Sequence, residues 1–233
     1  MLSTPLFRDR AEAGEKLAQA VLSEIAQFNL TVNDEITPVV YALPRGGLPI
    51  AVPIARRLGC PLDVVVAKKI ARPDNPELAI GAVTAEGHLV WSKQKPRNIR
   101  IQNATLQVAQ EKALSQLTAL APGRPSVTPK GALVILVDDG IATGMTMLAA
   151  AQALRMQQPA QLWICVPVTP PELIEFLHEV SDRLIVLETP DPFFSVSRFY
   201  EEFPQVETEE ALACLRQQAE WRSPAEIKPD ELS

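Results

Sequence analysis

The chain has 233 residues, of which 47% are hydrophobic and 21% are charged, and its formal net charge is −6 at pH 7. This composition is ordinary for a globular protein and excludes a chain that is disordered throughout. The length predicts one domain with an insertion rather than two domains. The longest apolar runs, near 48–55 and 131–137, are far shorter than the ~20 residues that span a bilayer.

The cysteines and the first residues both favour a cytoplasmic location. Cys60, Cys165 and Cys214 are widely spaced and odd in number, which excludes a disulfide framework and a CxxC metal site. The opening MLSTPLFRDR lacks the charged region followed by an apolar region that marks a secretory signal. We therefore expect a reducing compartment and no membrane partner.

Charge is unevenly divided along the chain. Residues 201–233 hold nine acidic and three basic residues, which accounts for the whole net charge of −6. Residues 41–130 hold thirteen Lys and Arg against five Asp and Glu, a local balance of +8. Such a basic segment suggests that this part of the chain meets an anion. The alternative is a solvated loop, particularly at 91–100.

Hydrophobic periodicity predicts an α/β protein. A helix is expected over 8–28, because the apolar residues there fall three or four apart and make one stripe. A buried strand at 38–43 ends in the turn PRGG at 44–47. A helix at 48–58 and a strand at 62–67 then complete a β-α-β unit, which favours parallel strands.

The following stretch departs from this alternation. Residues 68–76 are charged and contain proline, which predicts a mobile loop, and the pattern of 79–84 and 88–91 predicts a hairpin. Further elements are expected at 101–120 (helix), 132–137 (strand), 144–157 (helix), 161–166 (strand), 170–179 (helix), 183–187 (strand) and 207–221 (helix). We predict a doubly wound α/β fold with about five parallel strands and an inserted β-hairpin, forming a single domain over 1–221 with a loose tail at 222–233.

The most informative turn is LVILVDDGIATGMTM at 133–147. Its apolar strand delivers Asp138 and Asp139 to the carboxyl edge of the sheet, where ligands bind in doubly wound folds. The sequence TGMT at 143–146 then opens a helix, whose free N–H groups and positive potential suit a phosphate. Two adjacent carboxylates repel each other, so they require a sugar diol, a metal ion or both to stay ionised together.

Other catalytic and phosphate motifs do not fit. A Walker loop needs four residues between its glycines and then Lys-Ser/Thr, whereas Gly140 and Gly144 are separated by three residues and Met145 stands in the lysine position. No G-x-G-x-x-G follows a predicted strand, and no G-x-S-x-G is present. His88 and His178 have no triad or zinc spacing, so we expect them to be structural or exposed.

Residues 133–147 resemble the signature of type I phosphoribosyltransferases, in which an apolar strand, two acids and T-G-x-T follow one another; ATGMTM is nearest to the adenine-type variant. LPRGG at 43–47, NPELAIGAV at 75–83 and FFSVSRFYEEFPQV at 193–206 resemble an uncharacterised branch of the family. The resemblance covers about residues 8–220. The alternative for 133–147 is an ordinary strand-to-helix turn with a capping acid pair and a spacer glycine.

The resemblance implies an enzyme that binds phosphoribosyl pyrophosphate (PRPP) as its magnesium complex, transfers phosphoribose to a nitrogen acceptor such as a nucleobase, and releases pyrophosphate. Asp138 and Asp139 would hold the ribose hydroxyls and Mg²⁺, partly through water. The 5-phosphate would be bound by Ala142, Thr143, Gly144, Met145 and Thr146. The pyrophosphate would be bound by Arg45, Gly46, Gly47, Lys68 and Lys69, with Arg72 as a further candidate.

Two segments would cover the site in such an enzyme. Residues 68–92 match a flexible loop and hairpin that closes to exclude water, and family members often carry a cis peptide in the turn at 44–47. Residues 190–206 match a C-terminal hood, in which Phe193, Phe194 and Tyr200 could stack on the base or belong to the core. The alternative for Arg45 is a surface turn residue, and the alternative for the two lysines is a solvated loop.

Substrate and role stay open at this point. Hypoxanthine-guanine enzymes carry an acidic residue just before T-G, where this chain has Ala142, which argues against a 6-oxopurine substrate. A regulator on the same fold that senses PRPP or a nucleotide is the alternative, to which the +8 segment gives some support, whereas the acid pair and the loop lysines favour the enzyme. Nucleic acid is not an expected partner, because Trp91 is the only aromatic residue near KQKPR. The sequence leaves a homodimer open.

Overall fold

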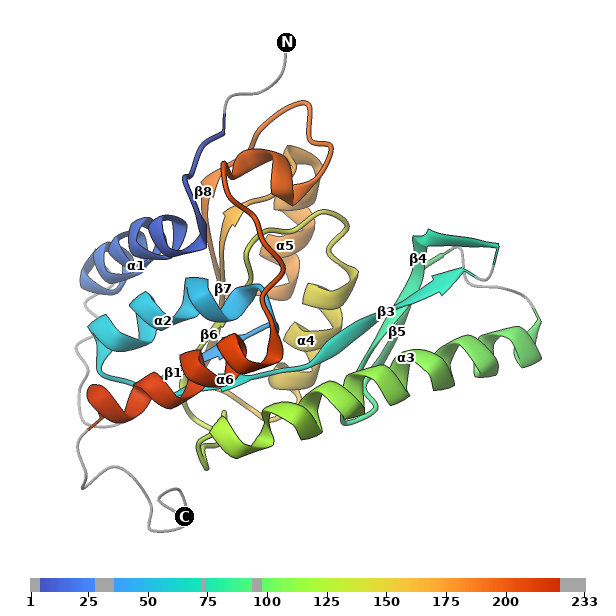
Figure 1. The fold of residues 1–233 in the computed structure, drawn as a ribbon, viewed down its shortest axis with the longest axis horizontal. Coiled ribbons are helices and arrows are strands. Elements are labelled where there is room, and N and C mark those ends of the chain that lie inside the picture. The colour runs from blue at the N-terminus through green and yellow to red at the C-terminus, as the bar shows by residue number, and fades with distance from the viewer. Residues whose placement is uncertain (1–4, 28–35, 73, 94–97, 223–233) are drawn as a thin grey trace.

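The computed structural model describes residues 5–27, 36–72, 74–93 and 98–222 (Figure 1). Its centre is a five-stranded parallel sheet with the strand order β2-β1-β6-β7-β8. The strands are β1 (Pro38–Ala42), β2 (Leu62–Val64), β6 (Leu133–Val137), β7 (Gln161–Val168) and β8 (Arg183–Glu188). The predicted α/β fold with about five parallel strands is therefore confirmed.

Helices cover both faces of this sheet, and side chains alternate between the two. In β1, Val40 and Ala42 belong to one core cluster, whereas Val39 and Tyr41 belong to the other, as the two-residue period of a strand requires. The first cluster packs against α1 (Arg10–Gln27), α2 (Gly47–Leu58) and α6 (Thr208–Arg216), and the second packs against α4 (Met145–Arg155) and α5 (Ile174–Val180). Among the described residues, no helix is both long and apolar enough to cross a membrane.

A smaller antiparallel sheet and a long helix form the inserted part. The sheet has the order β3-β4-β5, with β3 (Ala67–Arg72), β4 (Asn75–Thr84) and β5 (Leu89–Trp91), and the helix is α3 (Ile99–Leu120). This sheet lies between α3 and α4 and contacts both helices. In Figure 1, α3 runs along the small sheet on the side away from α4.

The loop expected at 68–76 is largely a strand. Residues 67–72 pair with β4, so the predicted two-stranded hairpin is a three-stranded sheet. The physical reason is Ile70, which is fully buried in a small cluster with Ile80 and Val83 and anchors a segment whose other side chains are mostly polar. The tail expected at 222–233 lies outside the described residues apart from Arg222, and so do 94–97 of the basic stretch at 91–100.

The segment before α1 is joined to a late part of the chain. Phe7 and Tyr200 form a parallel β-bridge. Backbone N–H groups of Leu6 and Phe7 donate to the carbonyl of Phe199, and the N–H of Glu201 donates back to Phe7. The start of α1 is therefore fixed beside residues 199–201.

The three cysteines are buried and free, as the absence of a disulfide framework predicts.

Candidate functional site

The acid pair lies where β6 ends at the carboxyl edge of the central sheet. Val137 pairs with Ala42 of β1 and Cys165 of β7, so Asp138 and Asp139 leave the sheet between two neighbouring strands. The backbone N–H of Asp139 donates to Oδ1 of Asp138 at 2.9 Å. Burial, with the charge of Asp139, raises the pKa of Asp138 well above its ordinary value. Such a pair requires a ligand or cation beside it to stay ionised.

Arg10, the first residue of α1, supplies a cation that sequence reasoning missed. Its Nε donates to Oδ2 of Asp139 at 2.8 Å, and its Nη1 donates to the carbonyl of Pro204 at 2.7 Å. The guanidinium carbon also lies 3.6 Å from the ring centroid of Phe203. Burial raises the pKa of Asp139, and Arg10 opposes that shift. One signal was present in the sequence, because a basic residue at a helix start opposes the helix dipole and therefore needs another reason to be there.

The predicted base-covering aromatics have three different surroundings. The Tyr200 hydroxyl donates to the backbone carbonyl of Asp139 at 2.6 Å, so this buried ring supports the acid pair. Phe193 packs against Phe199 with ring centroids 5.0 Å apart. Phe194 is 69% exposed and lies beside the guanidinium of Arg198, 5.1 Å away. Of the three, Phe194 is therefore the side chain that is available to a ligand.

The predicted phosphate turn runs directly into α4. Gly144 has φ +74° and precedes the first helical residue, Met145. A side chain there would be strained by this left-handed backbone and would contact the ring of Phe176 at 3.3 Å. Ala142 and Thr143 are exposed, and the first-turn N–H groups of a helix have no acceptors within the helix. The turn can thus present donors to an anion.

The PRGG turn lies directly against the acid pair. A Cβ added at Gly46 would overlap Oδ2 of Asp139, and one added at Gly47 would lie 2.8 Å from the carbonyl oxygen of Val137. The peptide bond between Pro44 and Arg45 is cis, as the family resemblance implies. Glycine at both positions therefore allows the two predicted halves of the site to meet.

The predicted pyrophosphate-binding cations separate into two groups. Arg45 and Lys68 line one cavity of about 700 Å³, and Nη1 of Arg45 donates to Oγ1 of Thr208 at 3.3 Å. Lys69 lines a second cavity of about 310 Å³, which shares Val108 and Lys112 of α3 with the first. Arg72 pairs with Asp74 at 2.7 Å in an exposed ion pair. Arg45 and Lys68 are thus the cations that share a cavity.

The carboxylates of Asp138 and Asp139 are chemically suited to Mg²⁺. This ion takes oxygen ligands and is commonly held by one or two carboxylates together with water and substrate phosphates. Within the described ranges, no group of three or more His, Cys, Asp or Glu side chains is placed to hold a metal. The fit is therefore to an ion shared with a phosphorylated substrate rather than to a cage made by the protein alone.

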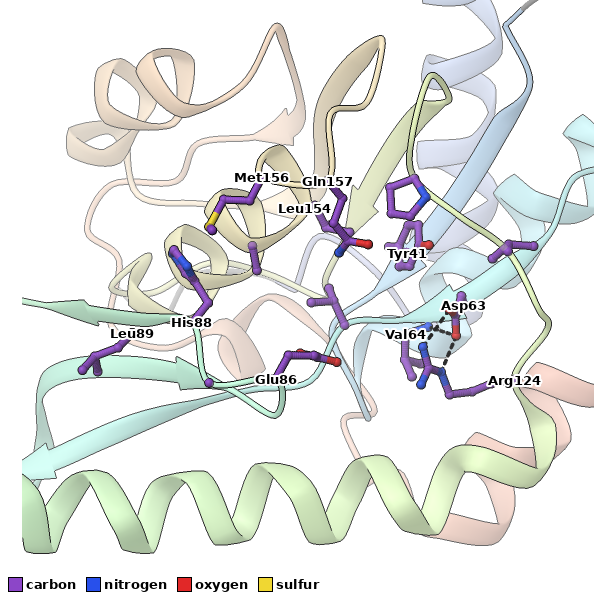
Figure 2. Close-up of a pocket in the computed structure, with 15 residues that line it drawn as sticks. Tyr41, Asp63, Val64, Glu86, His88, Leu89, Arg124, Leu154, Met156 and Gln157 are labelled. Atoms are coloured by element: carbon purple, nitrogen blue, oxygen red, sulfur yellow. Dashed lines mark hydrogen bonds and ion pairs between the residues drawn. The ribbon is translucent and has the colours of Figure 1, made fainter.

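A separate cavity of about 680 Å³ lies between the β4–β5 turn, the end of α4 and the segment at 124–129 (Figure 2). Figure 2 shows Arg124 reaching Asp63 with two bonds, Nε to Oδ1 at 2.6 Å and Nη2 to Oδ2 at 2.9 Å. His88 lines the same cavity and contacts Gln152 through Nε2 at 3.1 Å, whereas His178 is exposed. None of the site residues predicted from the sequence lines this cavity.

Comparisons with known proteins place this geometry in a family. The family described as "Phosphoribosyl transferase domain" matches residues 9–201. Two proteins of Mycobacterium tuberculosis, named as candidate phosphoribosyl transferases MT0597 and Rv0571c, are each 35% identical over 214 residues, or 90% of this chain and 46% of theirs. The chain therefore spans about half the length of these relatives.

A solved structure is also similar over nearly its whole length. The crystal structure of TT1426 from Thermus thermophilus has a TM-score of 0.74 and 36% sequence identity, and the match covers 93% of this chain and 99% of that one. The family match includes the acid pair, the phosphate turn and the PRGG turn, all at one edge of the sheet. From the sequence match and the architecture together, the chain belongs to the type I phosphoribosyltransferase family.

Proposed function

We propose that this protein is a phosphoribosyltransferase that uses PRPP with Mg²⁺, transfers phosphoribose to a nitrogen acceptor and releases pyrophosphate. The observation that carries the proposal is the close approach of the PRGG turn to the acid pair, where Gly46 leaves no space for a Cβ beside Asp139. A single ligand with phosphate groups at both ends of a ribose could engage the 142–146 turn, the carboxylates and Arg45 together.

Each part of this edge would have its own task. The backbone N–H groups of Ala142, Gly144 and Met145, with the hydroxyls of Thr143 and Thr146, would hold the 5-phosphate. Asp138 and Asp139 would accept hydrogen bonds from the ribose hydroxyls, and their negative charge would favour the cationic ring that forms as the bond to pyrophosphate breaks.

The leaving group would be stabilised by the cations. Arg45 and Lys68 share one cavity, and Lys69 would act from the smaller cavity. The turn residues Gly46 and Gly47 would allow the pyrophosphate to approach the backbone. Magnesium, held by the two carboxylates and the substrate's own oxygens, would neutralise charge on the departing pyrophosphate.

Two segments would exclude water from the reaction. Residues 68–92, built as β3, β4 and β5, would form one cover, and residues 190–206 would form the C-terminal hood. Exclusion matters because water would otherwise capture the electron-poor sugar.

The exposed ring of Phe194 would stack on the acceptor base, and Ala142 favours a base other than a 6-oxopurine. The free, buried cysteines suit work in the cytoplasm.

The test is pyrophosphate release from PRPP with Mg²⁺ and a panel of nucleobases and other nitrogen acceptors. Turnover with at least one acceptor, and its loss when PRPP is replaced by ribose 5-phosphate, is the expected result. Binding of PRPP or nucleotides without turnover of any acceptor, together with salt-dependent binding to RNA or DNA, would instead identify a regulator on this fold.

A further inference from the structure

The cavity that contains Arg45 and Lys68 has its outer wall on α3. From α3 it is lined by Lys112, Ser115 and Gln116, and Thr208 lines its other end. This helix belongs to the inserted part of the chain and packs against β3. Three cations, Arg45, Lys68 and Lys112, therefore converge on one cavity from a turn, a strand and a helix that are separate in the sequence.

The lining of this cavity carries three cations and one acid. The acid on its lining, Glu111, is exposed and accepts a hydrogen bond from Nε2 of Gln107 at 2.9 Å, along the helix. Burial, then the charges of Arg45 and Lys112, lowers the pKa of Lys68, while the charge of Asp138 opposes this shift. Repulsion between neighbouring cations is relieved by a bound anion.

Polar groups that accompany Lys112 suit the same ligand. Oε1 of Gln116 is buried and has no hydrogen-bond partner among the described residues. Rotation of the amide exchanges Oε1 with Nε2 and would present two N–H donors at this position. The Ser115 hydroxyl, one residue earlier, lines the cavity too and can donate to a phosphate oxygen.

We propose that Lys112, with Ser115 and Gln116 beside it, completes the pyrophosphate subsite from α3. The inference rests on the proposed function, because it assigns the diphosphate end of the PRPP site to this cavity. It adds a third cation to the two that the sequence motifs supply, and it gives the inserted helix a role in binding. Lys69 does not line this cavity, although it lines the smaller one that Lys112 also reaches.

Calorimetric titration of two probes, inorganic pyrophosphate with Mg²⁺ and ribose 5-phosphate, tests the proposal. Lys112→Ala should weaken pyrophosphate binding roughly tenfold or more, as loss of a charge-assisted contact does, and leave ribose 5-phosphate binding within about twofold. Lys112→Arg should retain most of the pyrophosphate affinity. Lys130→Ala, which removes an exposed lysine that lines none of the cavities described above, is the matched control and should change neither.

Each other outcome is decisive. Pyrophosphate affinity of Lys112→Ala equal to that of the control would overturn the inference and leave the proposed function intact. Equal weakening of both probes would show a general disturbance of the site and would overturn the assignment of Lys112. An unsubstituted protein that binds neither probe would overturn the proposed function itself, and the inference with it.

Discussion

Nε of Arg10 donates to Oδ2 of Asp139 at 2.8 Å across 129 positions of sequence, and the two side chains are 10% and 14% exposed. The pair fixes one acid at the edge of the sheet, while its neighbour, Asp138, accepts a hydrogen bond from the backbone N–H of Asp139. Arg10 is in turn held by Phe203 and the carbonyl of Pro204. The first turn of α1 thus positions a residue that the motif alone would leave mobile.

Arg10→Met should destabilise the fold by about 3 kcal/mol, because removal of one partner leaves a buried charge without compensation. Urea denaturation measures the loss. Arg10→Lys keeps the charge but not the planar contact with Phe203, so it should lose less. A variant Arg10→Met as stable as the unsubstituted protein would show that the ion pair contributes nothing to the fold.

Asp139→Asn should lower turnover of PRPP by roughly 10²-fold, comparable to the loss of one preorganised electrostatic partner. Steady-state kinetics with the preferred acceptor measure the effect, and circular dichroism checks that the fold is retained. Asp182→Asn removes an acid that pairs with Arg155 at the surface and should leave turnover unchanged. An unchanged rate in Asp139→Asn would place the chemistry elsewhere.

Gly46→Ala should lower turnover by roughly 10²-fold, because the new Cβ displaces either the turn or the carboxylate of Asp139, and small misplacements at a reacting centre are costly. The change is one methyl group at a half-buried position, so the melting temperature separates a local effect from unfolding. Full activity in a folded Gly46→Ala protein would contradict the close approach seen between this turn and the acid pair.

Pyrophosphate affinity should fall at alkaline pH, and it should do so at a lower pH than an ordinary lysine would give. The reason is that burial and the neighbouring cations lower the pKa of Lys68 more than the charge of Asp138 raises it. A lysine binds an anion in its charged form, which is lost as pH rises through the pKa. Titrations from neutral to alkaline pH measure the midpoint. Lys68→Arg, whose side chain stays protonated, should abolish this pH dependence. If the midpoint is unchanged in Lys68→Arg, the pH dependence comes from another group.

Arg124→Ala should cost about 3 kcal/mol of unfolding free energy, since it strands the carboxylate of Asp63, which is 3% exposed. The matched control is Arg155→Ala, which breaks an exposed ion pair with Asp182 and should cost less than about 1 kcal/mol. Chemical denaturation of both variants gives the comparison. Similar losses in the two would show that burial of the Asp63–Arg124 pair adds nothing to its strength.

Local patterns in the sequence were sufficient for the central sheet and the acid-pair motif. The apolar run of β6, the acids and the helix start lie within 133–147, so the path of the backbone from strand to helix could be predicted from their order. The same holds for the PRGG turn after β1. The antiparallel partner of β3 was not predictable in this way, because Ile70 alone marks that segment as buried and its pairing depends on β4.

Contacts between distant segments account for what the sequence did not predict. Arg10 pairs with Asp139 because the segment before α1 is held beside residues 199–202. Lys112 shares a cavity with Lys68 because α3 packs along the small sheet. The role of Tyr200 also depends on a distant contact, because its hydroxyl donates a hydrogen bond to the backbone carbonyl of Asp139. The sequence predicted instead that its ring could stack on a base. Helical periodicity gives the face of a helix but not the strand against which that face will lie.

The β-bridge between Phe7 and Tyr200 also sets the order in which the protein can be completed during its synthesis. Residues 6–8 leave the ribosome early, yet their backbone partners at 199–202 are made almost two hundred residues later. A nascent chain that has already formed β1 and β6 therefore still lacks Tyr200, whose hydroxyl donates a hydrogen bond to the carbonyl of Asp139. Stalled or truncated chains that end before residue 199 would have a sheet without a finished site.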